Sequence, residues 1–343
     1  MKPARKKVSL VNLAGEAEAA LRDIFYDQPL AWLKGARERA RNLPKTNYDL
    51  GCDFAEQGKW MDAIFRFRVA LYLQPAYPLA WYNLGCCYFR HGNRAKAKAA
   101  LLKELSLQPG HPDSIFMLAA IDPRALKPGD RPQHMPLAMV TGFFSSIAEG
   151  YDQVEAQNGY QAGKLVFEKV KSRLGASDLT VVDLGCGSGI AARPWRALAK
   201  EISGVEITPA MGMLATAATQ SEKKLFDQLI EADIAQLPDR LPADAADLVL
   251  VVNVVQFIGE LAGVLKGAAR LLKPGGTLAI TVEPHAAQTG FGLSDQTGRF
   301  GHSAAYVKQA AQASGLDFIS EFTVELYPEI PAGLFIFSKG ARA

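Results

Sequence analysis

A glycine-rich loop that directly follows a run of β-branched residues constrains the fold of this chain more than any other feature. The segment reads Val181-Val182-Asp183-Leu184-Gly185-Cys186-Gly187-Ser188-Gly189. A dinucleotide-binding loop needs a third glycine where this chain has Ile190, and it offers a helix N-terminus to an anionic pyrophosphate. Asp183 would repel that anion and suits a cation, such as an α-ammonium group. The loop therefore argues against a nicotinamide dinucleotide and predicts a ligand that carries a positive charge.

From residue 179 onward, short β-branched runs alternate with helical patterns, which favours parallel strands joined by crossover helices. The expected strands are Leu179–Leu184, Ile202–Ile207, Gln228–Glu231, Asp247–Asn253, Thr277–Val282, Phe318–Val324 and Gly333–Phe337. The clearest helix spans Leu261–Leu272. Pro328 and Pro331, rather than a helix, separate the last two strands. We therefore predict a Rossmann-like α/β sheet, parallel with an antiparallel last strand.

The glycine loop resembles motif I of the class I S-adenosylmethionine-dependent methyltransferases, and three further segments follow in that family's order. They are Glu206 after the second strand, Ala232-Asp233-Ile234 before Leu237-Pro238, and the turn Leu271–Gly276. The resemblance implies S-adenosyl-L-methionine as cofactor, with Glu206 accepting hydrogen bonds from the ribose hydroxyls and Asp233 on the adenine amine. The residues expected to bind the cofactor are Asp183, Gly185, Cys186, Gly187, Gly189, Glu206, Ile207, Asp233, Ile234 and Asn253.

Two segments outside the glycine loop extend the resemblance. Phe144 to Asp152 is similar to a lead-in of small-molecule methyltransferases that forms a helical lid over the cofactor, although Phe144 and Tyr151 could also be plain core residues. Gly298 to Ser303, followed by Tyr306, looks like the C-terminal signature of bacterial methyltransferases that carry tetratricopeptide repeats. That group does not supply the identity of the methyl acceptor.

The acceptor pocket of this fold is usually built by the lead-in helix and by the segment after the fifth strand. Arg299 could anchor a carboxylate or phosphate, and His302 has a pKa suited to a general base, with Tyr306 one turn later. Both Arg299 and His302 could instead cap the following helix or pair with nearby carbonyl groups. The candidate acceptor-site residues are Tyr151, Gln256, His285, Arg299, His302 and Tyr306.

Several classes of function receive no support from the sequence. Asn253-Val254-Val255-Gln256-Phe257 lacks the prolines of the turn with which this class methylates nucleobase amines or glutamine amides, and no nucleic-acid-reading pattern is present. The four cysteines form no C-x-x-C pair and the histidines do not cluster, so we expect no metal site. Free thiols fit a cytoplasmic protein, and no apolar run approaches the roughly 20 residues of a membrane helix.

The first third of the chain contains a repeat with a period of 34 residues. Leu50-Gly51 recurs as Leu84-Gly85, Ala63 as Ala97, and Pro75 as Pro109. Together with Trp81 and Tyr88, the second copy resembles the tetratricopeptide consensus. The glycines allow the two helices of a repeat to approach closely, and each proline ends a helix. Segments 16–41 and 113–121 are expected to supply flanking helices.

These patterns predict three parts: a helical tetratricopeptide module over residues 1–122, a proline-rich linker over 123–136, and a methyltransferase domain over 137–343. The expected function is methyl transfer to a small-molecule or carrier-bound acceptor, with the repeats either binding a protein partner or packing on the catalytic domain. The alternative is a non-catalytic adaptor, in which the repeats bind a partner and the sheet only senses S-adenosylmethionine.

Overall fold

The computed structural model describes residues 28–340, except residues 176, 222, 238, 286–288 and 295–296, with side chains described from residue 42 on. The basic N-terminus, the start of the expected flanking segment 16–41, and Pro238 lie outside the described residues. By contacts between residues, the chain divides into two compact units, Met1–Ser114 and Ile115–Ala343.

The division falls inside helix α6 (Pro112–Ile121), earlier than the linker expected from the prolines. Two short 3₁₀ turns follow, η2 (Pro123–Ala125) and η3 (Pro128–Asp130). The end of the expected linker then pairs with residues 257–259: the Gly259 amide donates to the Gln133 carbonyl at 2.7 Å, and the Met135 amide donates to the Phe257 carbonyl at 2.9 Å. Residues 133–135 are therefore held by backbone hydrogen bonds, a feature that a proline-rich sequence does not indicate.

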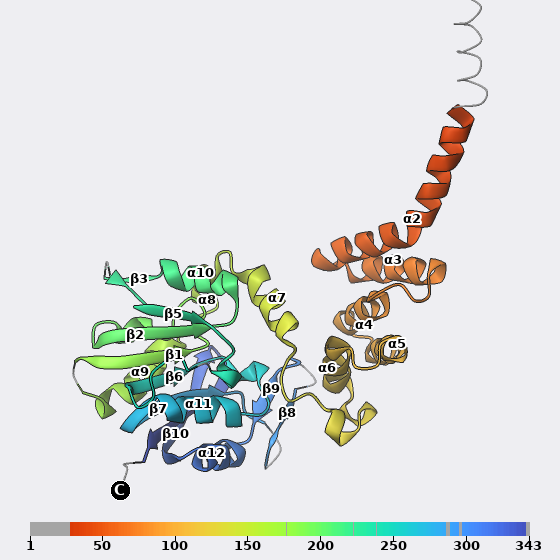
Figure 1. Cartoon of the computed structure of the whole chain (residues 1–343). Coiled ribbons are helices and arrows are strands. Elements are labelled where there is room, and N and C mark those ends of the chain that lie inside the picture. The colour runs from red at the N-terminus through yellow and green to blue at the C-terminus, as the bar shows by residue number, and fades with distance from the viewer. Residues whose placement is uncertain are drawn as a thin grey trace, which may run out of the picture. The chain divides into compact units, whose positions relative to one another are not determined.

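The N-terminal unit contains the helices α2 (Gln28–Glu56), α3 (Trp60–Leu73), α4 (Ala80–Arg90) and α5 (Arg94–Leu107), shown in red and orange in Figure 1. A Cβ atom on Gly51 would lie 2.7 Å from the Phe67 ring, and one on Gly85 would lie 2.9 Å from Leu101. Only glycine allows this approach of the paired helices, as the 34-residue repeat predicts. The Trp81 indole donates to the Pro75 carbonyl at 2.8 Å and ties one repeat to the next.

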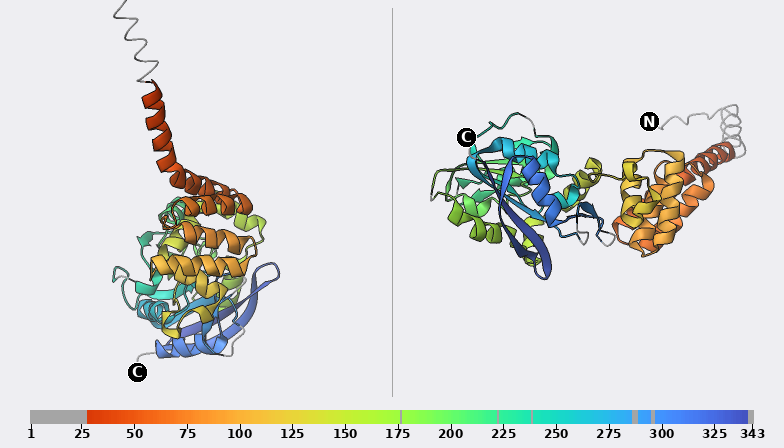
Figure 2. Two further views of the ribbon diagram at one scale, coloured as in Figure 1. Left: turned by 90° about the vertical axis from the view of Figure 1, so that its right-hand side faces the viewer. Right: turned by 90° about the horizontal axis from the view of Figure 1, so that it is seen from below.

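The second unit is built on a seven-stranded sheet in the order β10-β11-β7-β6-β1-β2-β5. Its strands are β1 (Leu179–Leu184), β2 (Ala199–Glu206), β5 (Gln228–Glu231), β6 (Ala246–Val251), β7 (Leu272–Val282), β10 (Leu316–Tyr327) and β11 (Ile330–Lys339). Strand β11 is antiparallel to both of its neighbours, whereas β7, β6, β1, β2 and β5 are mutually parallel. The predicted Rossmann-like sheet with an antiparallel last strand is confirmed. Figure 2 shows the β10–β11 hairpin, in dark blue, extending from the sheet.

Helices cover both faces of this sheet, and each face has its own apolar core. On one face, α11 (Ala262–Leu271) and α12 (Ala304–Ala313) pack on the strands through side chains that include Leu265 and Val307. On the other, α9 (Ala162–Val170), α10 (Pro209–Ala217) and the 3₁₀ turn η5 (Arg193–Trp195) do so, with Trp195 fully buried. The lead-in forms α7 (Leu137–Ile147) and α8 (Tyr151–Gln157).

The structure also contains elements that the sequence pattern does not reveal. Two small hairpins form, β3 (Thr219–Gln220) with β4 (Lys223–Lys224), and β8 (Phe291–Leu293) with β9 (Phe300–His302). The second lies in the segment after the fifth strand, for which the sequence pattern predicts no strand. Within the described part of the chain, no helix is long and apolar enough to span a bilayer, and no group of three or more potential metal-binding side chains occurs.

Candidate active site

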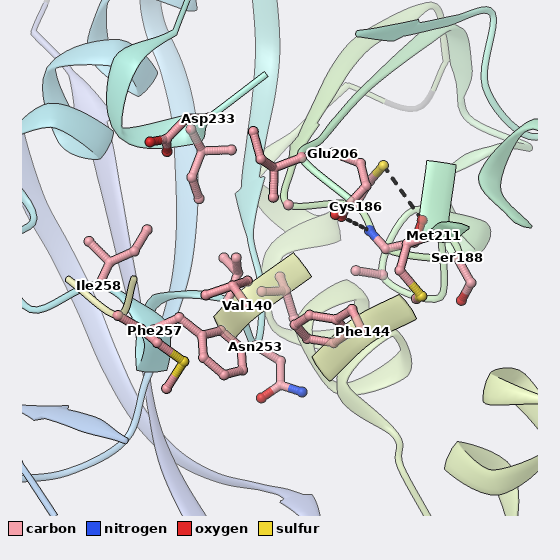
Figure 3. A pocket seen from close by; sticks show the side chains of 18 of the residues that line it. Val140, Phe144, Cys186, Ser188, Glu206, Met211, Asp233, Asn253, Phe257 and Ile258 are labelled. Atoms are coloured by element: carbon pink, nitrogen blue, oxygen red, sulfur yellow. Dashed lines mark hydrogen bonds between the residues drawn. The ribbon is translucent and has the colours of Figure 1, made fainter. Parts of the chain in front are cut away.

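A cavity of about 300 Å³ opens at the carboxyl ends of the parallel strands, the edge at which open α/β sheets bind ligands. Its floor follows the glycine loop and the ends of β2, β5 and β6, and α7 and α8 form its opposite wall (Figure 3). The lining includes eight of the ten residues expected to bind the cofactor: Gly185, Cys186, Gly187, Glu206, Ile207, Asp233, Ile234 and Asn253.

The glycine loop turns sharply because three of its glycines have positive φ angles: 76° at Gly185, 55° at Gly187 and 92° at Gly189. The amides of Gly185 and Cys186 both donate to the Val205 carbonyl, which fixes the loop on β2. Gly189 does not line the cavity. A Cβ atom there would lie 2.3 Å from Leu225, so this glycine is required for packing behind the loop.

Asp183, the other expected residue absent from the lining, is buried next to the cavity on β1. Its side chain is 1% exposed, and its Oδ2 atom has no hydrogen-bond partner. Burial, and then the nearby charge of Glu206, raises the pKa of the Asp183 carboxyl to about 7. A buried carboxylate without a partner is costly, and a bound ammonium group would supply the missing hydrogen-bond donor and the opposite charge. The site therefore fits the cation that the loop sequence predicts.

The remaining acidic residues of the cavity are fixed by backbone amides. Glu206 accepts hydrogen bonds from Gly187 N at 2.9 Å and from Thr208 N at 2.8 Å, one on each carboxylate oxygen. Asp233 accepts from Ala235 N at 2.8 Å and so caps the short turn after β5. Each bond uses one lone pair of an oxygen, which leaves acceptor capacity for ligand hydroxyl or amino groups.

Asn253 follows β6 and is held in the left-handed region, with φ 55°. Its amide donates to Thr281 Oγ1 at 2.8 Å, and its Oδ1 accepts from Gln256 Nε2 at 3.1 Å. Gln256 is itself buried and does not line the cavity, although we expected it at the acceptor site. It braces Asn253 instead.

The lead-in helices supply an aromatic wall. The Phe144 ring makes edge contacts with Phe257 at 5.4 Å and with Tyr151 at 6.5 Å between ring centroids, and all three residues line the cavity. An ion pair between Asp152 and Arg193 ties α8 to the segment after the glycine loop. The lead-in is thus helical, and α7 and α8 line the cavity. Of the acceptor-site candidates, only Tyr151 lines it.

Sequence reasoning missed three polar residues beside the same cavity. Tyr160 lines it, and the Tyr327 hydroxyl donates to Glu155 Oε2 at 2.7 Å. Tyr327 lies at the end of β10, 172 positions from Glu155. No local pattern brings these residues together, and only the position of the final hairpin does. His134 and Met135, from the expected linker, also line the cavity.

His302 and Tyr306 lie behind the cavity wall rather than at its surface, which differs from the expectation of a general base. His302 is 1% exposed, and its Nε2 lies 2.9 Å from the Ile258 carbonyl and 3.1 Å from the Gly259 carbonyl. Two carbonyl partners require a donor, so Nε2 carries the proton. Burial lowers the pKa of His302 to about 4. The Tyr306 hydroxyl accepts from Leu261 N at 2.9 Å, so both residues hold the 258–261 turn.

Arg299 and His285 are also absent from the cavity lining. The Arg299 guanidinium pairs with Glu283 at 3.1 Å and is 40% exposed, so a carboxylate of the chain already occupies the anchor expected for an anionic acceptor. The His285 ring lies against Gly292, where a Cβ atom would come within 2.6 Å of Nε2. Both residues thus brace the β8–β9 hairpin.

Comparison with known families agrees with this arrangement. Residues 182–280 match the model of a methyltransferase domain, and residues 78–111 match that of a tetratricopeptide repeat. The second unit therefore contains a methyltransferase domain, with the fold of the class I S-adenosylmethionine-dependent methyltransferases. The first match runs from the strand before the glycine loop to β7, and the second covers the second copy of the 34-residue repeat.

Curated relatives of this chain are named for different acceptors. A malonyl-[acyl-carrier protein] O-methyltransferase of Pseudescherichia vulneris is 34% identical over 143 residues, which are 41% of this chain and 52% of the relative. A ubiquinone biosynthesis O-methyltransferase of Bradyrhizobium sp. (strain ORS 278) is 29% identical over 105 residues, 31% of this chain and 40% of the relative. The chain thus spans about half the length, or less, of these relatives.

Among solved structures, the crystal structure of the [4+2]-cyclase SpnF has a TM-score of 0.50 and 17% sequence identity. The alignment covers 61% of this chain and 99% of that one. At this identity, the similarity supports the fold of the second unit and nothing about its acceptor.

Proposed function

We propose that this protein transfers the methyl group of S-adenosylmethionine to an uncharged, hydroxyl-bearing acceptor with an apolar or aromatic body. The observation that carries this proposal is the composition of the cavity beyond the glycine loop. Its walls are Leu137, Val140, Phe144, Tyr151, Phe257 and Ile258, and no lysine or arginine is among its described lining residues. An anionic acceptor would lose its hydration there without gaining a cationic partner.

The cofactor would lie across the strands in a fixed order. We assign its α-ammonium group to Asp183, its ribose hydroxyls to Glu206, and its adenine amine to Asp233. The backbone of Gly185, Cys186 and Gly187 would contact its methionine portion, and Ile207 and Ile234 would flank the adenine. Three independently placed carboxylates support this assignment, because each matches a different polar group of one ligand.

The main task of the protein in this reaction would be to position the acceptor oxygen and the methyl group. A bound sulfonium would supply a methyl group that is already activated, so the acceptor oxygen would bond to the methyl carbon as the sulfur–methyl bond breaks. The proton of the acceptor hydroxyl would pass to solvent water. Holding the two groups at attack distance can contribute about 7–11 kcal/mol. The aromatic wall of Phe144, Tyr151 and Phe257 would orient a flat acceptor and exclude water. His302 and Tyr306 would support that wall through the 258–261 turn, without contacting the acceptor.

The proposed acceptor class is tested by measuring S-adenosylhomocysteine formation with two types of acceptor. An alkyl-substituted catechol is uncharged at pH 7, whereas a malonyl thioester carries a carboxylate. We expect turnover with the catechol and at least tenfold less with the malonyl thioester. Faster turnover of the malonyl thioester would contradict the proposal and favour a carrier-bound anionic acceptor.

Binding of S-adenosylmethionine should weaken as the pH falls through 7. The Asp183 carboxyl has its pKa raised to about 7, so it is ionised above this pH and ready to pair with the ammonium group. Below it, binding must first displace a proton, and we expect affinity at pH 6 to be about tenfold lower than at pH 8. Isothermal titration calorimetry at the two pH values measures this. The same titration with Asp183→Asn should show no such dependence, and a persisting dependence would assign the effect to another group.

We also propose that the repeat unit binds a protein partner. The outer side of α3 exposes Met61 and Phe65, each 60% accessible, and Tyr72, 87% accessible, at positions four and seven residues apart. These spacings place the three side chains along one side of the helix, and large apolar side chains exposed together commonly mark interaction surfaces.

A further inference from the structure

A hydrogen-bonded chain of three residues lies beside the cavity and has no part in the function proposed above. The Tyr327 hydroxyl donates to Glu155 Oε2 at 2.7 Å, and Asn253 Nδ2 donates to the Tyr327 hydroxyl at 3.5 Å. The Tyr160 ring packs on the Tyr327 ring with 4.8 Å between centroids. These hydrogen bonds therefore connect α8, the end of β10 and the residue after β6, which are distant in the sequence.

The first member of this chain is a buried acid. Glu155 is 9% exposed, and its described hydrogen bond comes from a neutral phenol, not from a cation. Burial raises the pKa of the Tyr327 phenol, and the hydrogen bond to Glu155 raises it further, so the tyrosine remains the donor and the acid the acceptor. Tyr327 thus fixes the position of the carboxylate without cancelling its charge.

The last member of the chain reaches the cavity. Asn253 lines it, as Figure 3 shows, and its left-handed backbone and its bonds to Thr281 and Gln256 leave its side chain little freedom. Tyr151, in the same helix as Glu155, also lines the cavity. Burial raises the pKa of the Tyr151 phenol, the charges of Glu155, Asp152 and Glu206 add to this, and the charge of Arg299 opposes it. The negative charge of Glu155 therefore acts on a side chain that forms part of the cavity wall.

The strand order shows which part of the cofactor lies nearest to this field. Asp233 follows β5, Glu206 ends β2, Asp183 lies on β1, and Asn253 follows β6, and these strands are neighbours in the order β5-β2-β1-β6. If adenine binds at Asp233, ribose at Glu206 and the ammonium group at Asp183, the sulfur would lie near the middle of this row of strands. The acceptor side of the cavity would then include Asn253, to which the Glu155–Tyr327 pair is connected.

We propose that Glu155, held by Tyr327, is a positioning residue that favours the sulfonium of S-adenosylmethionine over the neutral thioether of S-adenosylhomocysteine. This inference rests on the proposed function of the same site. The two ligands carry the same ammonium and carboxylate groups, and they differ in charge only at the sulfur. A fixed negative charge in a partly dry site stabilises the first ligand and not the second. The product would then leave more readily than the substrate, because methyl transfer removes the charge that Glu155 attracts.

The test compares three ligands by calorimetry: S-adenosylmethionine, S-adenosylhomocysteine and sinefungin, which carries an amine beside the position of the sulfonium. Glu155→Gln keeps an oxygen that can accept from Tyr327 and removes only the charge. We expect it to weaken S-adenosylmethionine and sinefungin about fivefold to tenfold and to leave S-adenosylhomocysteine within about twofold, as expected for one charge at intermediate dielectric. Glu168→Gln, an exposed acid on α9, is the matched control and should change none of the three.

Two results would overturn this inference. The first is an equal change for all three ligands in Glu155→Gln, which would make Glu155 a structural residue only. The second is no change for any of them. If Glu155→Gln does not fold, Tyr327→Phe is the second test, because it keeps the Glu155 carboxylate but removes the hydroxyl that holds it in place. If this variant keeps the wild-type ratio of affinities for S-adenosylmethionine and S-adenosylhomocysteine, the proposal is contradicted. Wild-type protein that binds none of the ligands would instead reject the proposed function itself.

Discussion

Replacing Asp183 with Asn is expected to weaken S-adenosylmethionine binding about 10-fold to 100-fold, the range for loss of a charged hydrogen bond. The same change should stabilise the ligand-free protein. At pH 8 the wild-type carboxyl, whose pKa is raised to about 7, is ionised in a buried site. Each unit of that rise costs about 1.4 kcal/mol, a cost that the amide lacks. Calorimetry and urea denaturation measure the two effects.

A control separates this combination of weaker binding and higher stability from a general effect of removing one negative charge. Asp317 is an exposed acid on β10, and Asp317→Asn should alter neither affinity nor the denaturation midpoint. Wild-type affinity in the Asp183→Asn protein would show that Asp183 does not bind the ammonium group. If Asp183→Asn is less stable to urea than the wild type, the Asp183 carboxyl accepts a hydrogen bond or pairs with a charge in the ligand-free protein.

Replacing Glu206 with Ala should have an equal or larger effect on cofactor binding. The variant loses both proposed ribose contacts, and it also leaves Gly187 N and Thr208 N without the acceptors that hold the loop. Two charged hydrogen bonds together correspond to a loss of about 100-fold or more in affinity. Calorimetry with S-adenosylhomocysteine measures the loss and avoids turnover.

The matched control for this variant is Glu231→Ala. Glu231 is the register partner of Glu206 on β5, and it is exposed and absent from the cavity lining. It should bind the ligand as the wild type does. If the two variants lose affinity equally, general electrostatics rather than a ribose contact explains the effect of Glu206.

The sequence predicts the sheet and the cofactor half of the cavity well because local patterns encode both. Strands β1 and β5 occur with the expected bounds. In β1, β-branched residues lead directly into the glycine loop. The glycine loop and the acidic residues near the ends of neighbouring strands converge because parallel strands share one edge. These features depend on short stretches of chain.

The acceptor half is predicted poorly because it depends on contacts between distant segments. His302 has the residue type and spacing of a base, but the β9 strand turns it toward the carbonyls of residues 258 and 259. Residues 133–135 have the composition of a linker, yet they pair with the turn after β6. The Glu155–Tyr327 bond joins positions 172 residues apart, and neither residue has a local pattern that indicates its partner.

The position of Tyr327 has a consequence for the order in which the protein matures during synthesis. Glu155 leaves the ribosome early in the second unit, whereas the β10–β11 hairpin, which supplies Tyr327, comes 172 residues later. At typical elongation rates this interval lasts roughly 10 to 35 seconds, long enough for the helical repeats to fold first. During that time the glycine loop can form on β1 and β2, but α8 has no Tyr327 to hold its acid. Until the hairpin is made, the acid on α8 thus lacks the hydroxyl group that holds it in the finished protein.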